Sequence, residues 1–150
     1  MRIPALVQQA AAAGMPAVAL TDLGNLFALV RFYQAALAAG IKTIGGAELW
    51  LRNPDRPTQP FRLILLIQDD NGYHHLTHLI SRSYQTGQQY GQPQIESDWL
   101  TPDNCTGLIA LSGGHEGDVG QALLRNQPDL AARRLQHWQT LFGDRYVLQL

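Results

Sequence analysis

The chain has little cysteine, little lysine and no long apolar run, and each shortage excludes a class of protein. Its single cysteine, Cys105, cannot form an internal disulfide and is typical of a reducing cytoplasm. No apolar stretch approaches the roughly 18 residues that a membrane span needs, so we expect no membrane partner. The Ala-rich start is interrupted by Gln8 and Gln9 and does not form the apolar core of a signal peptide. These absences predict a cytoplasmic protein.

Charge and composition set further bounds. The net charge is −1, and only one of the 11 basic residues is a lysine, so no basic field gathers nucleic acid around the chain. An apolar fraction of 45% suffices for a hydrophobic core and excludes a disordered chain. A length of 150 residues fits one domain or part of one.

Apolar strands alternate with amphipathic helices along the chain. We expect strands at 17–20, 41–51, 61–68, 107–111 and 145–150. We expect helices at 3–13, 25–39, 72–86, 117–125 and 128–142. In the second helix the apolar positions with helical spacing are Leu26, Leu29, Val30, Tyr33 and Leu37. The proline-rich segment 52–60 predicts a loop or hairpin turn, and the polar segment 87–93 a flexible loop.

This alternation favours an α/β fold with a parallel sheet or barrel. The pattern begins with a helix that has no strand before it and ends on a strand with nothing after it. Unpaired edges of parallel strands would promote aggregation. We therefore expect a piece of a larger β/α fold, truncated at both ends.

Two carboxylates stand where α/β folds place their chemistry. Asp22 and Glu48 each follow or end an apolar strand, and the carboxyl ends of parallel strands carry the active sites of such folds. Glu48 alone would need a partner and a tuned pKa to act as a general base. The pattern favours a residual hydrogen-bonded pair of these two residues, kept for packing.

Two other motifs have competing interpretations. His74 and His78 have the i, i+4 spacing of a metal clip, but no acid lies between them, which favours surface histidines. The glycine-rich segment 112–118 follows a strand and precedes a helix, where it could cradle a phosphate. Its two acids would repel an anion, which favours a tight turn, and His115 remains a minor candidate for a ligand.

Four blocks, at 19–49, 63–87, 107–124 and 142–150, carry a family resemblance. In their order and spacing they resemble the PHP (polymerase-and-histidinol-phosphatase) domain at the N-terminus of bacterial DNA polymerase III alpha subunits. The resemblance implies a partial, distorted (β/α)7 barrel, truncated at both ends. It also implies that 1–150 is part of one PHP domain, with its first strand before Met1 and the remainder after Leu150.

The resemblance also shows which residues differ from the metal-binding members of the family. Those members hold a trinuclear site of His, Asp, Glu and Cys ligands, beginning with a His-x-His-Ser motif that this sequence lacks. Asp22 and Glu48 remain as vestigial positions, whereas the ligands are replaced at Leu23, Arg62 and Gly114. The resemblance thus implies no metal site, no catalytic residue and no cofactor in this piece.

What the resemblance implies about function concerns a larger protein. The full subunit would be a DNA-directed DNA polymerase that binds DNA and uses Mg²⁺ held by carboxylates outside this sequence. This piece would be a metal-free scaffold that contacts the proofreading exonuclease subunit and other replicase subunits. The alternatives are a free-standing PHP-type metal-dependent phosphoesterase and an error-prone alpha-subunit paralogue, although the segment 21–33 fits the replicative type better.

Overall fold

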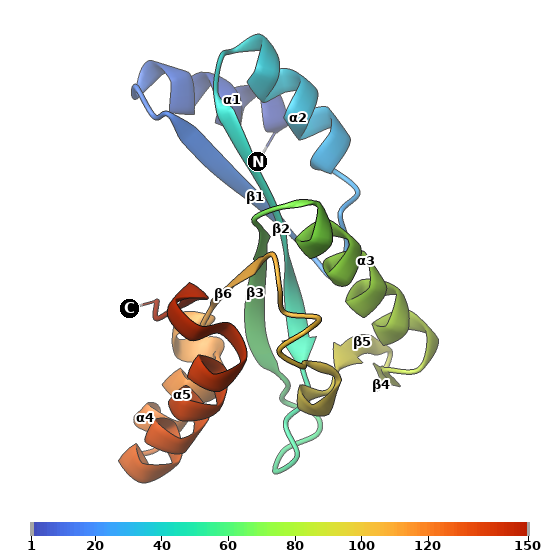
Figure 1. Ribbon diagram of the computed structural model, residues 1–150, viewed down its shortest axis with the longest axis vertical. Coiled ribbons are helices and arrows are strands. Elements are labelled where there is room, and N and C mark those ends of the chain that lie inside the picture. Colours follow the sequence, from blue (N-terminus) through green and yellow to red (C-terminus); the bar gives the residue numbers. More distant parts are fainter. Residues whose placement is uncertain (1, 150) are drawn as a thin grey trace.

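The computed structural model describes residues 2–149 and shows one twisted sheet with helices packed against it (Figure 1). The helices are α1 (Ile3–Ala12), α2 (Leu29–Ala38), α3 (Asp70–Gln85), α4 (Asp118–Leu124) and α5 (Pro128–Phe142). The strands are β1 (Ala17–Leu23), β2 (Lys42–Leu51), β3 (Phe61–Ile67), β4 (Gln88–Gln89), β5 (Gln92–Ile95), β6 (Leu108–Leu111) and β7 (Tyr146–Val147). Short 3₁₀ turns lie at Ser97–Trp99, Gly114–Glu116 and Gly143–Arg145.

The sheet is mixed and open. Its strand order is β4-β5-β2-β3-β6-β7, and β1 pairs with β2. Strand β2 runs parallel to β1 and to β5, and β6 runs parallel to β7. Strand β3 lies between β2 and β6 and is antiparallel to both. The α/β class is therefore confirmed. The predicted parallel arrangement is wrong for β3, and the sheet does not close into a barrel within residues 2–149.

The connection between β2 and β3 explains the reversed direction. A parallel neighbour needs a crossover of a dozen or more residues, but 52–60 is short and rich in proline. Asn53 is buried and holds this loop together, because its amide donates to the carbonyl of Gln59 at 2.9 Å. Its side-chain oxygen accepts from the backbone amides of Asp55 and Arg56, both at 3.2 Å. The hairpin alternative for this segment is thereby confirmed.

The segment 87–93, expected as a flexible loop, contains most of the β4–β5 hairpin. Its turn residues Tyr90 and Gly91 have φ values of 50° and 77°. Positive φ at both central residues is the geometry of a type I′ turn, which matches the twist of the flanking strands. The prediction failed because the tyrosine at the first turn position is not one of the usual turn residues.

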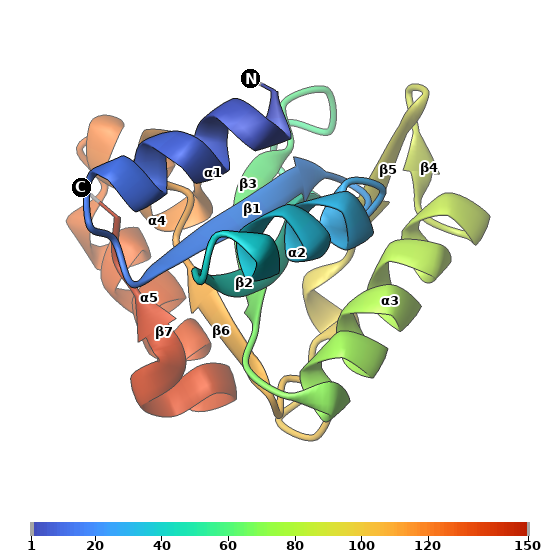
Figure 2. The ribbon, with the colours of Figure 1, turned by 90° about the horizontal axis from the view of Figure 1, so that it is seen from above.

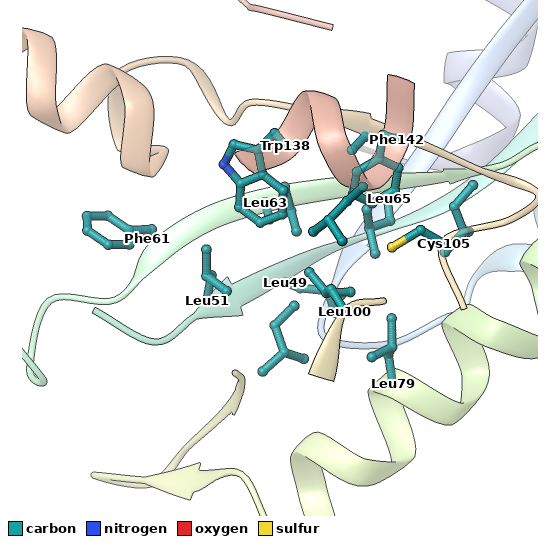
Figure 3. Packing of buried hydrophobic residues seen from close by; sticks show 14 of the residues in the cluster. Leu49, Leu51, Phe61, Leu63, Leu65, Leu79, Leu100, Cys105, Trp138 and Phe142 are labelled. Carbon is teal, nitrogen blue, oxygen red and sulfur yellow. The ribbon is translucent and has the colours of Figure 1, made fainter. Parts of the chain in front are cut away.

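The helices pack against one face of the sheet, because the strand residues of both cores, such as Val18, Leu49 and Leu63, share that face by register. Figure 2 shows α1 and α2 alongside β1. Strand residues of this face alternate with residues of the other. The larger core is centred on β2, β3 and α5, where Trp138 and Phe142 lie over Leu63 and Leu65 (Figure 3). A smaller core joins α1 and α2 to β1, and its buried residues are Val7, Ala10, Phe32, Ala36 and Ile41. The opposite face carries the half-buried residues Glu48, Trp50, Arg62, Ile64, Leu66, Ile109 and Leu111.

Helix α2 is turned away from the orientation that its apolar spacing suggests. Val30, Tyr33 and Leu37 are 66%, 53% and 64% exposed, whereas Phe32 and Ala36 are fully buried. The helix packs on β2 and α1 instead, with Phe32 and Ala36 in the smaller core. Packing therefore decided which face is buried, against the simple count of apolar residues.

A buried carboxylate anchors the second half of the fold. Both oxygens of Asp118 accept from the indole nitrogen of Trp138 at 3.0 Å. Its Oδ1 also accepts from the backbone amide of Val119 at 2.8 Å. Burial raises the pKa of Asp118 above its ordinary value, although the hydrogen bond from Trp138 and the charge of Arg134 oppose the shift.

This raised pKa predicts a pH-dependent stability. The folded state holds the Asp118 proton more tightly than the unfolded state does. The contribution of protonated Asp118 to the free energy of unfolding is therefore fully present below its ordinary pKa of 3.8. It is lost as pH rises through the pKa of the folded state. Asp118→Asn keeps an acceptor for Trp138 but cannot ionise. We expect Asp118→Asn to gain stability relative to the native protein as pH rises from the ordinary value of 3.8 towards neutrality. Urea unfolding of both proteins across this range measures it, and a constant difference would contradict it.

Candidate functional site

A cluster of charges lies on the face of the sheet opposite the helices. The guanidinium of Arg62, on β3, donates a hydrogen bond to Oε2 of Glu48 on the neighbouring strand β2. Its Nε lies 3.5 Å from Oε2 of Glu116, in the turn after β6. The same guanidinium sits 4.6 Å from the ring centroid of Trp50. One cation thus joins two carboxylates and an aromatic ring from three segments that are distant in sequence.

The fold brings to this cluster the positions at which the family resemblance implies replaced ligands. Leu23 pairs in register with Glu48, so the two side chains lie on the same face, and Leu23 is 44% exposed. The turn that carries Gly114 packs on β3, where a Cβ at Gly113 would collide with the carbonyl oxygen of Arg62. Leu23 and Arg62 therefore lie beside Glu48, and the turn that carries Gly114 reaches the same cluster through Glu116.

Asp22 has a different role from the expected one. It pairs in register with Ala47, one residue away from Glu48, and strand alternation places its side chain on the opposite face. Its Oδ2 accepts from the backbone amide of Ala28 at 3.1 Å, next to the start of α2. Asp22 thus supports the N-terminus of α2, whereas Glu48 binds Arg62. The predicted hydrogen-bonded pair of Asp22 and Glu48 is therefore wrong. Asn25, at the start of the segment expected to be helical, accepts from the amide of Phe27 at 3.0 Å, and α2 begins only at Leu29.

The residues around Glu48 do not fit a metal ion. A protein site of the zinc type needs three or more N, O or S donors that converge. Here a leucine and a glycine offer no side-chain donor, and the guanidinium of Arg62 occupies Glu48 as a cation. Within residues 2–149 no group of three His, Cys, Asp or Glu side chains could hold a metal.

The glycine-rich segment forms a tight turn. The amides of Glu116 and Gly117 donate to the carbonyl of Gly113 at 3.1 and 3.2 Å, and Gly113 itself donates to Gln149. These amides are thus used within the protein, which confirms the turn interpretation over a phosphate cradle. The carboxylate of Glu116, which lies beside Arg62, is a further reason against a phosphate site, because it would repel an anion.

The histidines of α3 do not converge on a site. His74 and His78 are exposed, and His74 contacts the ring of Tyr73 at 5.8 Å. His75 instead forms a hydrogen bond between Nδ1 and the carbonyl of Thr106 at 3.0 Å. Burial raises the pKa of the Cys105 thiol to about 11, so this cysteine stays protonated and is a poor nucleophile.

The family resemblance singled out Arg62 as the position of a replaced ligand, but sequence reasoning missed its two carboxylate partners. No local pattern connects Arg62 with Glu48, fourteen positions away, or with Glu116. The resemblance nevertheless offered a signal, since it implies that an arginine stands in place of a metal ligand while the acid Glu48 is retained.

Comparison with known proteins identifies the family. The model of the PHP domain matches residues 1–150. The chain belongs to the PHP family. It is 43% identical to the DNA polymerase III subunit alpha of Pseudomonas fluorescens over 150 residues, which are all of this chain and 13% of that protein. It is 45% identical to the same subunit of Escherichia coli K12 over 145 residues, which are 97% of this chain and 12% of that protein.

The PHP chain thus spans about 13% of the length of these relatives, at their N-terminal end. A solved structure from Bifidobacterium adolescentis, described as a candidate metal-dependent phosphoesterase, matches with a TM-score of 0.54 and 10% identity. That match covers 91% of this chain and 77% of the other, and it shows the fold alone. None of the helices between residues 2 and 149 is long and apolar enough to cross a membrane.

Proposed function

We propose that this PHP chain is part of a cytoplasmic DNA polymerase III alpha subunit and serves there as a metal-free scaffold. The identity of about 45% to the N-terminal part of such subunits supports this role. The whole subunit would transfer nucleotides to a DNA end with Mg²⁺, using carboxylates outside this sequence. The piece itself would neither polymerise nor hydrolyse.

The ion pair of Arg62 with Glu48 is the observation that carries the metal-free part of the proposal. In a metal site the cation neutralises the carboxylate, and its loss would leave Glu48 half-buried and unpaired at a cost in free energy. The guanidinium supplies a fixed positive charge to both Glu48 and Glu116. An arginine that replaces a metal ion in this way keeps the local charge balance and the strand packing, without Lewis-acid chemistry.

Metal analysis tests the scaffold role. We expect the protein expressed from its own gene to contain no stoichiometric zinc, manganese or iron after gel filtration, because the guanidinium of Arg62 competes for Glu48. Inductively coupled plasma mass spectrometry measures the content. Two or three bound metals per chain, together with hydrolysis of a phosphate ester, would instead favour the free-standing phosphoesterase.

The proposal includes a partner, the proofreading exonuclease subunit. We expect this subunit from the same organism to co-purify with the protein expressed from its gene, and sedimentation velocity to show a complex. The support is the relatedness to the polymerase subunit, whose replication context implies such a partner. An exonuclease that sediments separately at micromolar concentrations of both proteins would contradict the docking role but leave the metal-free role intact.

A further inference from the structure

A second charged site lies at the ends of β2 and β3, on the opposite face of the sheet from the Glu48 cluster. A cavity of about 260 Å³ opens where the end of β2, the start of β3, the 3₁₀ turn Ser97–Trp99 and α5 meet. Its lining residues are Leu51, Arg52, Pro54, Phe61, Ser97, Asp118, Arg133, Arg134 and His137. Three of these are arginines from two different segments, and one is an acid.

The three arginines differ in how much of their bonding capacity is used. Arg52 contacts Glu96 through Nη1 at 2.6 Å, and its buried Nε has no hydrogen-bond partner among residues 2–149. Arg134 donates from Nη1 to the carbonyl of Asp118 at 2.6 Å, with its guanidinium 4.8 Å from the ring centroid of Phe61. Arg133 is exposed, and no hydrogen bond or ion pair engages it within the described part of the chain.

Two further polar side chains complete the wall of the cavity. The hydroxyl of Ser97 lies 3.1 Å from Nε2 of His137, so one donates to the other. His137 follows Arg133 by one helical turn on α5, which places the two side chains on the same side of the helix. Donors thus face the cavity from α5 and from the 3₁₀ turn, in addition to Arg52 from the end of β2.

The nearby acids do not cancel this charge. Both oxygens of Asp118 are held by the indole of Trp138, and its burial favours the neutral form. Glu96 is already paired with Arg52. Asp55 lies 3.9 Å from Arg134, is largely exposed and does not line the cavity. The lining of the cavity therefore holds three arginines against one acid, Asp118. Among the described residues Arg133 has no ion-pair partner, and the Nε of Arg52 has no hydrogen-bond partner.

We propose that this cavity binds a tetrahedral oxyanion, the phosphoryl group of inorganic phosphate or of a small phosphorylated molecule. Arginine forks recognise phosphate and carboxylate alike. A planar carboxylate needs only one arginine, which donates two parallel hydrogen bonds to its two oxygens. The four oxygens of a phosphate point in tetrahedral directions, and the donors here come from three segments around the cavity. The site is independent of the Glu48 cluster and of the polymerase assignment.

Isothermal titration of the protein expressed from its own gene, at constant ionic strength, tests this site. Inorganic phosphate is expected to bind saturably and more tightly than acetate. Arg133→Ala should weaken phosphate binding about tenfold, the value of one charge-assisted hydrogen bond. Arg31→Ala is the matched control, because Arg31 is also an exposed helical arginine but lies on α2, outside the cavity.

Each outcome bears on the proposal. Equal affinity for phosphate and for deoxyadenosine monophosphate would support free phosphate as the ligand, and tighter binding of the nucleotide would support a phosphorylated small molecule. Arg52→Gln provides a second variant with the same expected loss. No saturable binding of either anion, an affinity for acetate equal to that for phosphate, or an equal loss in Arg31→Ala would overturn the site.

Discussion

Replacing Trp138 with alanine is expected to lower the free energy of unfolding by about 3–5 kcal/mol. The indole is 1% exposed, stacks on Tyr146 with centroids 5.8 Å apart and lies over the strands of the main core. Alanine would leave a cavity there and remove the donor that satisfies both oxygens of buried Asp118. Denaturant unfolding followed by circular dichroism measures the loss.

Two further variants separate packing from hydrogen bonding. Trp138→Phe keeps most of the packing but leaves Asp118 without its indole donor, which should cost about 1–3 kcal/mol. Tyr33→Ala is the control, since Tyr33 is an exposed aromatic residue on α2 and should change stability by less than about 0.5 kcal/mol. A Trp138→Ala variant no less stable than Tyr33→Ala would mean that α5 does not pack on β3 as described.

Replacing Arg62 with methionine is expected to destabilise the fold by about 1–2 kcal/mol, a value reduced for partial exposure. Methionine keeps much of the side-chain volume over Trp50 but removes the charge. Glu48, with a side chain 22% exposed, would then lack its partner beside Glu116. Thermal and denaturant unfolding at low salt measure the effect.

The matched control is Arg52→Met. Arg52 pairs with only one glutamate, Glu96. The side chains of Arg52 and Glu96 are 31% and 25% exposed, close to the 23% and 22% of Arg62 and Glu48. Since Arg62 holds two carboxylates, Arg62→Met should cost more than Arg52→Met. If Glu48→Gln restores stability in the Arg62→Met background, the cost comes from the unpaired carboxylate. Equal effects of the two arginine variants would contradict the special role of the Glu48 cluster.

The expected element positions agree closely with the structure wherever the signal is local. Helix α5 begins and ends where the pattern from 128 to 142 places it, because a proline at its start and a glycine after its end punctuate it. Strand β3 (Phe61–Ile67) matches the strand expected at 61–68 to within one residue. The last strand is shorter than expected, with Tyr146–Val147 paired and Leu150 outside the described residues.

The sequence by itself determined the family and most of the order of strands and helices, apart from the β4–β5 hairpin, because these depend on residue identity and local periodicity. The replacement of metal ligands at Leu23, Arg62 and Gly114 stays a prediction from the family resemblance. Only the tertiary structure decided the direction of β3, the buried face of α2 and the partners of Arg62. Each of these depends on contacts between segments far apart in the chain, where burial and charge pairing outweigh local preference. The pairing of Arg62 with Glu48 and Glu116 is the clearest case, since opposite charges 14 and 54 positions apart carry no periodic signal.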